Sequence, residues 1–204
     1  MPRLPIALVL LGCGSASPPA TEGSPEPSPA DELAAFERSL LDAESLTLPF
    51  SIEAEGAVEA ELEGELQIEG AMIRLTAVGT FASETVDLQL RADESFLFIG
   101  ESEQPRPPHL KEAVVLGLTR MGILHNLALL TSGQPPDHSD VGVGRWLRVH
   151  VREAAPYALD ILVDGEVRAH AQLTVAAGRL VSREQTVSFS EGEMRVRETY
   201  GNGG

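Results

Sequence analysis

The sequence predicts an α+β fold that is mainly β, with a curved antiparallel sheet or half-open β-barrel and a helical lid. Three observations lead to this prediction. Apolar and polar side chains alternate along several segments, as expected for strands with one face in a core and the other in water. Dipeptides suited to tight turns separate these segments. One segment in the middle of the chain is apolar around more than half of a helix, so it must pack against another element.

A short amphipathic helix is expected over residues 31–43, at the start of the folded part. Asp31 and Glu32 lie in its first turn, where negative charge interacts favourably with the helix dipole. Four apolar side chains follow at helical spacing: Leu33, Phe36, Leu40 and Leu41.

The clearest strand pattern covers residues 51–69. The even positions are all apolar or glycine, whereas seven of the odd positions are Glu. This period of two predicts one long strand, or two strands broken at Gly56. Similar alternation covers residues 73–81 and 86–92, and a short apolar stretch follows at 96–99.

The alternation resumes after an interruption over residues 104–144. It covers residues 147–151, 159–163 and 167–175, and two further strands end near Tyr200. Three dipeptides are expected to form hairpin turns between these strands: Asp164-Gly165, Ala177-Gly178 and Glu191-Gly192. The sequence therefore predicts about eight or nine antiparallel strands in meander order.

The interruption contains the apolar helix, which is expected over residues 109–131. Its apolar positions are Leu110, Ala113, Val114, Leu118, Met121, Leu124, Leu127, Ala128 and Leu130. The concave face of the sheet is the available place for it. Gly117 and Gly122 each cost about 1 kcal/mol in a helix interior, which a movable lid would tolerate, although the helix could equally be ordinary core. The candidate cavity residues are Leu118, Met121, Leu124 and His125, and no role is assigned to Val114.

The N-terminus has the layout of a secretory signal, with Arg3 followed by an apolar run that is too short to span a bilayer. The run ends in Leu10-Leu11-Gly12-Cys13, which resembles the lipobox of bacterial lipoproteins. This resemblance implies cleavage before Cys13 and attachment of acyl lipid to its thiol, whereas the alternative is an ordinary cysteine. By analogy with Gram-negative lipoproteins, Gly14 favours the outer membrane, with the protein facing the periplasm. Residues 14–30 contain five prolines and are expected to form a tether.

The composition limits the partners. The formal net charge is -16, which argues against nucleic-acid binding because phosphates require clustered Lys and Arg. Residues 30–103 contain 18 acidic and 3 basic side chains, so this half is expected to expose an acidic face. That face is either simply solvated or a docking site for a cation or a basic protein. The chain has one cysteine, so it can form no intramolecular disulfide and no zinc site built on several thiolates.

Catalytic, cofactor and metal sites are not expected. Asp137-His138-Ser139-Asp140 groups suitable side chains, but adjacent residues in a loop cannot converge as a catalytic triad does. Gly142-Val143-Gly144 lacks the preceding strand and following helix of a phosphate-binding loop. The Glu side chains of residues 51–69 would be solvated on the outer face of a strand. The chain is therefore expected not to be an enzyme.

The order of the predicted elements resembles the LolA/LolB-like lipoprotein-carrier superfamily. A helix, a run of strands, a helical insert and a final meander ending in Glu198-Thr199-Tyr200 follow the lipobox, and residues 157–165 are the most suggestive stretch. The resemblance implies a half-open barrel, closed by helices, that shelters acyl chains. We therefore expect a signal peptide (1–12), a lipidated tether (13–30), a ligand-binding domain (31–200) and a tail (201–204). The alternative function is a non-catalytic envelope scaffold that binds a protein through its acidic face.

Overall fold

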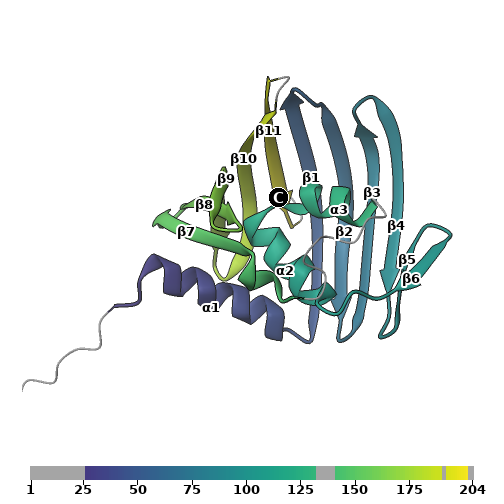
Figure 1. Cartoon of the computed structure of the whole chain (residues 1–204), viewed down its shortest axis with the longest axis horizontal. Coiled ribbons are helices and arrows are strands. Elements are labelled where there is room, and N and C mark those ends of the chain that lie inside the picture. The colour runs from purple at the N-terminus through teal and green to yellow at the C-terminus, as the bar shows by residue number, and fades with distance from the viewer. Residues whose placement is uncertain (1–25, 132–140, 190–191, 202–204) are drawn as a thin grey trace, which may run out of the picture.

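The computed structural model describes residues 26–131, 141–189 and 192–201. In this part of the chain, eleven strands form a single antiparallel sheet. Three α-helices lie on one side of it, with α2 and α3 across the sheet and α1 alongside its β7 edge (Figure 1). The mainly β fold with a curved sheet and a helical cover is confirmed, and the sheet does not close into a barrel.

Two meanders make up the sheet and join at its centre. The N-terminal meander consists of β1 (Ser45–Gly56), β2 (Ala60–Glu69), β3 (Met72–Phe81), β4 (Glu84–Ala92), β5 (Phe96–Ile99) and β6 (Ser102–Pro105). The C-terminal meander consists of β7 (Leu147–Glu153), β8 (Tyr157–Val163), β9 (Glu166–Ala176), β10 (Arg179–Phe189) and β11 (Gly192–Tyr200), with a 3₁₀ turn before it at Val143–Arg145. β1 pairs with β11, so the first and last strands lie side by side and β6 and β7 form the edges.

The strand predictions are confirmed with two refinements. Residues 51–69 belong to two strands, β1 and β2, and the even positions of both face the core because the register pairs even positions with even positions, such as Ala54 with Ala60. The sheet has more strands than the eight or nine expected. The short β6 has no alternating pattern and ends at Pro105, so periodicity could not identify it.

The predicted hairpin turns connect the expected strands. Asp164-Gly165 joins β8 to β9, and Ala177-Gly178 joins β9 to β10. The third turn includes residues 190 and 191, which lie outside the described residues, although β10 and β11 pair as far as its start.

The first helix, α1, is confirmed but begins earlier than predicted. It covers Pro29–Asp42, and Ser28 caps its N-terminus by accepting a hydrogen bond from the backbone N–H of Asp31 at 3.2 Å. The Asp31 carboxylate accepts one from the Ser28 backbone N–H in return, a reciprocal pair typical of a capping box. Residues 28–30 thus belong to the fold rather than to the predicted tether.

The expected single helix over residues 109–131 is wrong. The structure has two helices, α2 (Leu110–Arg120) and α3 (Ile123–Thr131), separated at Met121 and Gly122. Gly122 has a φ of +90°, a conformation that ends α2 and that L side chains rarely adopt. Within the described residues, no helix is long and apolar enough to cross a membrane.

A buried ion pair fixes α1 against α2. Arg120 donates hydrogen bonds from Nε and Nη2 to the two carboxylate oxygens of Glu37, at 2.9 and 2.7 Å. The Thr119 hydroxyl donates a third bond to Glu37, at 2.7 Å. Because these bonds satisfy both carboxylate oxygens, Glu37 is tolerated at only 4% exposure.

Candidate ligand cavity

A cavity of about 470 Å³ lies between α3 and the inner face of the sheet. Thirteen of the described residues line it, and nine of them are apolar. The apolar residues are Val58, Phe81, Met121, Leu124, Ile161, Ala169, Val187, Met194 and Val196. The polar residues are His125, Arg168, Gln185 and Glu198.

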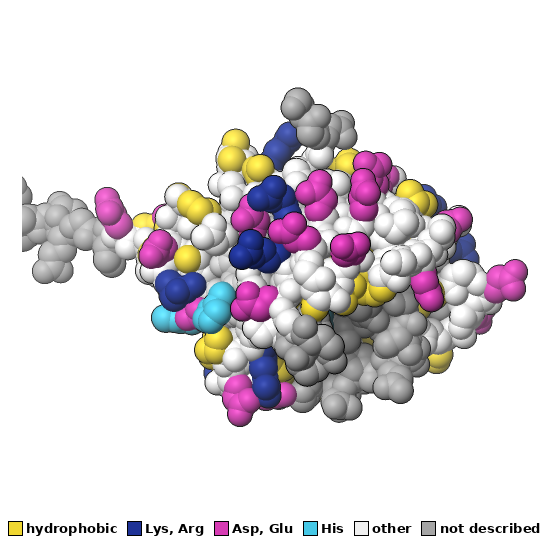
Figure 2. Space-filling model, turned by 90° about the horizontal axis from the view of Figure 1, so that it is seen from above, with side chains coloured by type: hydrophobic (Ala, Val, Ile, Leu, Met, Phe, Trp, Pro, Cys, Tyr) yellow, Lys and Arg dark blue, Asp and Glu magenta, His cyan; other side chains and the backbone are white. Residues whose placement is uncertain are grey.

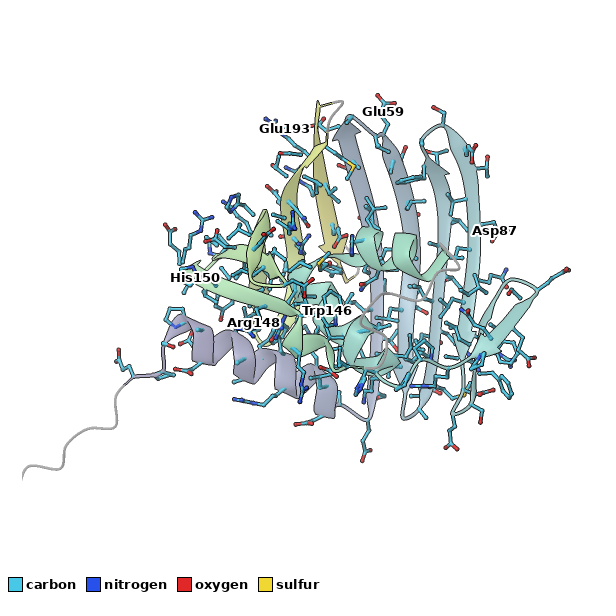
Figure 3. All side chains as sticks on the ribbon, viewed as in Figure 1. Glu59, Asp87, Trp146, Arg148, His150 and Glu193 are labelled. Atoms are coloured by element: carbon cyan, nitrogen blue, oxygen red, sulfur yellow. The ribbon has the colours of Figure 1, made fainter. Side chains whose placement is uncertain are left out.

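The strand register orders the lining residues by depth. On β11, Met194, Val196 and Glu198 follow one another toward the centre of the sheet, and they pair with Val187, Gln185 and Arg183 on β10. Met194 and Val58 adjoin Glu193 and Glu59, which lie at neighbouring hairpin ends (Figure 3). The apolar end of the cavity is therefore toward the hairpin ends, and Glu198 forms its floor.

Glu198 connects the floor of the cavity to the start of α3. Its side chain is 1% exposed. Oε1 accepts a hydrogen bond from the backbone N–H of Leu124 at 2.9 Å, and Oε2 accepts one from the Tyr200 hydroxyl. A carboxylate at the N-terminus of a helix is also stabilised by the helix dipole. Glu198 therefore holds the break between α2 and α3 against the sheet.

Arg183 is the buried cation opposite Glu198 in the strand register. Its side chain is 1% exposed, and Nη2 donates a hydrogen bond to the backbone carbonyl of Arg120 at 2.8 Å. Nε is buried and has no hydrogen-bond partner among the described residues. Burial lowers the pKa of Arg183, whereas the charge of Glu198 acts in the opposite direction. Burial and the nearby Glu198 carboxylate raise the pKa of Tyr200 well above its usual value. The floor therefore contains one group of each charge, close together.

Close packing explains Gly117 in α2 and Gly122 at the break between α2 and α3. A Cβ at Gly122 would lie 2.6 Å from Oε1 of Glu198 and 2.8 Å from Nη1 of Arg183. A Cβ at Gly117 would lie 2.2 Å from the Asn126 amide, where α2 approaches α3. Both glycines thus allow close contact with neighbouring side chains. Gly122 lies outside both helices, and the helix-propensity cost of Gly117 does not require a movable lid.

The remaining polar lining groups lie above the floor. Burial lowers the pKa of His125, and the positive charge of Arg183 lowers it further, so the imidazole is neutral at pH 7. Gln185 is half-buried at the middle level, opposite Val196. Arg168 is exposed and forms an ion pair with Glu166 at 2.6 Å.

The structure brings together three of the four predicted cavity residues. Met121, Leu124 and His125 line the cavity, whereas Leu118 does not and is buried at 1% exposure. Val114, to which no role was assigned, is also buried. Cys13 and the loop Asp137-His138-Ser139-Asp140 lie outside the described residues.

Three polar residues of this site were not identified from the sequence: Arg183, Gln185 and Glu198. A signal for them exists, because they occupy core-facing positions in alternating strands, where apolar side chains are expected. A bulge between Leu180 and Ser182 hides that signal in β10, since it changes which positions face the core.

The outer face of the sheet carries the expected acidic side chains. Glu53 and Glu55 on β1 and Glu61 and Glu63 on β2 are exposed. Arg197 and Arg195 on β11 lie opposite Glu53 and Glu55 in the register, so part of the negative charge is compensated. In the view toward the hairpin ends, acidic side chains lie next to basic ones (Figure 2).

A second polar cluster lies on the outer face of the C-terminal meander. Asp160 contacts Nδ1 of His170 at 2.7 Å, Nδ1 of His150 at 3.4 Å and Nε of Arg152 at 3.0 Å. Burial acts to raise the pKa of Asp160, but hydrogen bonds from the two imidazoles and the Arg152 charge outweigh it and lower that pKa. Among the described residues, no group of three or more His, Cys, Asp or Glu side chains has the geometry to hold a metal ion.

Comparison with protein-family models finds no match to this chain, and comparison with curated proteins finds no significant match. The cavity and its polar floor are therefore the basis for any functional assignment.

Proposed function

We propose that this chain is a membrane-anchored extracytoplasmic lipoprotein that binds a hydrophobic ligand, such as a lipid or acyl chain, in the cavity under α3. The observation that carries the proposal is the 470 Å³ cavity with its largely apolar wall. Small-molecule sites have volumes of about 300–1,000 Å³ and combine an apolar wall with a few polar groups. The resemblance of the chain to lipoprotein carriers agrees with such a role.

The anchor is proposed from the sequence Leu10-Leu11-Gly12-Cys13. Cys13→Ala should move the protein from the membrane to the soluble extracytoplasmic fraction, or leave it as an uncleaved precursor. Detergent partitioning and the mass of the purified protein measure this directly. Identical partitioning and mass, apart from the substitution itself, would exclude lipidation at Cys13.

Ligand binding is tested with a fluorescent fatty acyl probe and two matched variants. Val187→Trp places a large ring in the cavity, because Val187 lines it, and should abolish saturable probe binding. Val78→Trp makes the same change on the outer face, where Val78 is 53% exposed, and should leave binding intact. Circular dichroism checks that both variants are folded.

Two results would contradict the ligand-binding proposal. One is wild-type protein with no saturable probe binding. The other is equal binding by the Val187→Trp and Val78→Trp variants, which would place the probe elsewhere on the surface.

A second candidate function is a scaffold that docks a basic protein. Its support is the exposed Glu side chains of β1 and β2. Reversing two of these charges with Glu61→Lys and Glu63→Lys should then abolish a salt-sensitive complex in the cell envelope, while Val187→Trp leaves it unchanged. Pull-downs that recover the same proteins with both variants would argue against this function.

A further inference from the structure

The charges around the cavity restrict the ligand that it can hold, and this step rests on the proposed function. Among the described residues, the two charged ones that line the cavity each have a counter-charge of their own. Glu198 lies opposite Arg183 in the strand register, and Arg168 is paired with Glu166. A ligand with a net charge would therefore bring an uncompensated charge into a site of low polarity, which is strongly unfavourable.

The floor nevertheless offers polar contacts. A carboxylate has about four lone-pair positions, and in Glu198 the Leu124 N–H and the Tyr200 hydroxyl use two of them. Glu198 belongs to the cavity wall and is 1% exposed, so solvent hardly reaches its oxygens. A hydrogen-bond donor carried into the cavity would find an acceptor there, and the Gln185 amide and the His125 imidazole lie on the same wall.

We infer that the cavity selects a neutral amphiphile with a hydroxyl group, of the fatty-alcohol or acylglycerol class, over a free fatty acid or an alkylammonium. The hydroxyl donates to the Glu198 carboxylate, and the hydrocarbon chain extends past Val196 and Met194 toward the hairpin ends. A fatty acid would instead place a second carboxylate beside Glu198. An alkylammonium would add a second cation near Arg183.

The test compares dodecanol, dodecanoate and dodecylammonium as competitors of the fluorescent acyl probe at neutral pH. Because the three competitors have the same alkyl chain, any difference in their affinity is due to the polar group alone. Dodecanol should displace the probe at a concentration about tenfold lower than either ion, because each ion brings a charge without a counter-charge into the site. Equal or tighter binding of dodecanoate or dodecylammonium would overturn the inference. Absence of any saturable probe binding would instead overturn the proposed function.

A matched pair of variants tests whether charge balance sets this preference. Gln185→Lys adds a cation to the cavity wall and should shift the preference to dodecanoate. Thr186→Lys adds the same charge one residue later on the exposed outer face of β10 and should leave the preference for dodecanol unchanged. Both positions lie outside the hydrogen-bonded group of Glu198, Tyr200 and Leu124. An unchanged preference in Gln185→Lys, with probe binding retained, would show that charge balance does not select the ligand.

A second variant acts on the floor itself. Glu198→Gln keeps a side-chain oxygen for the Leu124 N–H but removes the counter-charge of Arg183. Dodecanoate should then bind tighter than dodecanol, which is the reverse of the order in the wild type. A general loss of packing would weaken both competitors together and would not reverse their order. If the variant still binds the probe and still prefers dodecanol to dodecanoate, Glu198 does not determine which polar group the cavity binds.

Discussion

The two meanders of the sheet face the same helices but are built differently. In β1 to β4, the core-facing positions carry apolar side chains or glycine, apart from the exposed Glu84 at the start of β4, and the strands pair without a register shift. In the C-terminal meander, three strand pairs contain a register irregularity, and β10 and β11 turn Arg183, Gln185 and Glu198 inward. Most of the residues that line the cavity come from this second, irregular half. Departures from regular strand patterning thus gather where the candidate site lies, as is common for functional sites.

The largest expected effect comes from placing a charge in the regular half. Leu62 and Glu198 both lie opposite Ile52, on the two sides of β1. Glu198 is tolerated because it has hydrogen-bond donors and Arg183, whereas Leu62, 3% exposed, has apolar neighbours in the register. Leu62→Glu should therefore lower the free energy of unfolding by about 4 kcal/mol or more, measured by urea denaturation.

The control for Leu62→Glu is Val78→Glu, on the exposed outer face of β3. Its free energy of unfolding should stay within about 0.5 kcal/mol of wild type. Similar denaturation midpoints for the two variants would show that the regular half accepts a buried charge as readily as the irregular half does.

A second comparison separates packed core from cavity wall within the two helices. Leu118 is 1% exposed and does not line the cavity, so Leu118→Glu should destabilise the protein by about 3 kcal/mol. Leu124 lines the cavity, so the carboxylate of Leu124→Glu has space and should cost about 1 kcal/mol while abolishing binding of the acyl probe. Thermal unfolding and probe titration measure the two effects. Equal destabilisation by both variants would mean that Leu124 is also ordinary core.

Periodicity predicted the regular half of the sheet well. The alternation of Glu with apolar residues over 51–69 was sufficient to place β1 and β2 and their inner face, because the apolar residues lie on the buried face and the Glu residues on the opposite face. The pairing of β1 with β11 joins residues that are far apart in the chain, and strand periodicity contains no information about it.

The site was predicted only in part, for a physical reason. Met121, Leu124 and His125 could be proposed because a wide apolar helix face must pack against the sheet. In the sequence, Glu198 is one more charged residue in a strand, since its role depends on the break at Gly122, the Leu124 N–H and Arg183. Such a site is formed by tertiary contacts, which cannot be deduced from local sequence patterns.

A smaller effect is expected from removing one donor to Glu198. Tyr200→Phe deletes the hydroxyl that bonds to Oε2 of this buried carboxylate, so the free energy of unfolding should fall by about 1–2 kcal/mol. Tyr157→Phe is the matched control, since the Tyr157 hydroxyl interacts with the exposed Glu32. Thermal denaturation at neutral pH should show a clear decrease only for Tyr200→Phe. Equal melting temperatures for the two variants would mean that the hydroxyl of Tyr200 contributes nothing to the floor.

The smallest effect concerns pH and His125, which lines the cavity. Burial and the positive charge of Arg183 lower the pKa of His125 below its ordinary value of 6.5, and Glu198 and Arg168 are the other charged groups on the same wall. The unfolded chain therefore binds a proton at this residue more readily than the folded protein does. The contribution of neutral His125 to the free energy of unfolding is therefore fully present above the pKa of histidine in the unfolded chain. It decreases as the pH falls below about 6.5. His125→Leu should remove this pH dependence. Between about pH 7.5 and pH 5.5, the melting temperature of the variant should therefore decrease by a few degrees less than that of the wild type. His109→Leu changes a histidine at the start of α2 whose side chain is 41% exposed, and it serves as the control, with the wild-type decrease retained. If His125→Leu loses as many degrees as wild type over this interval, the imidazole is not held neutral by the cavity.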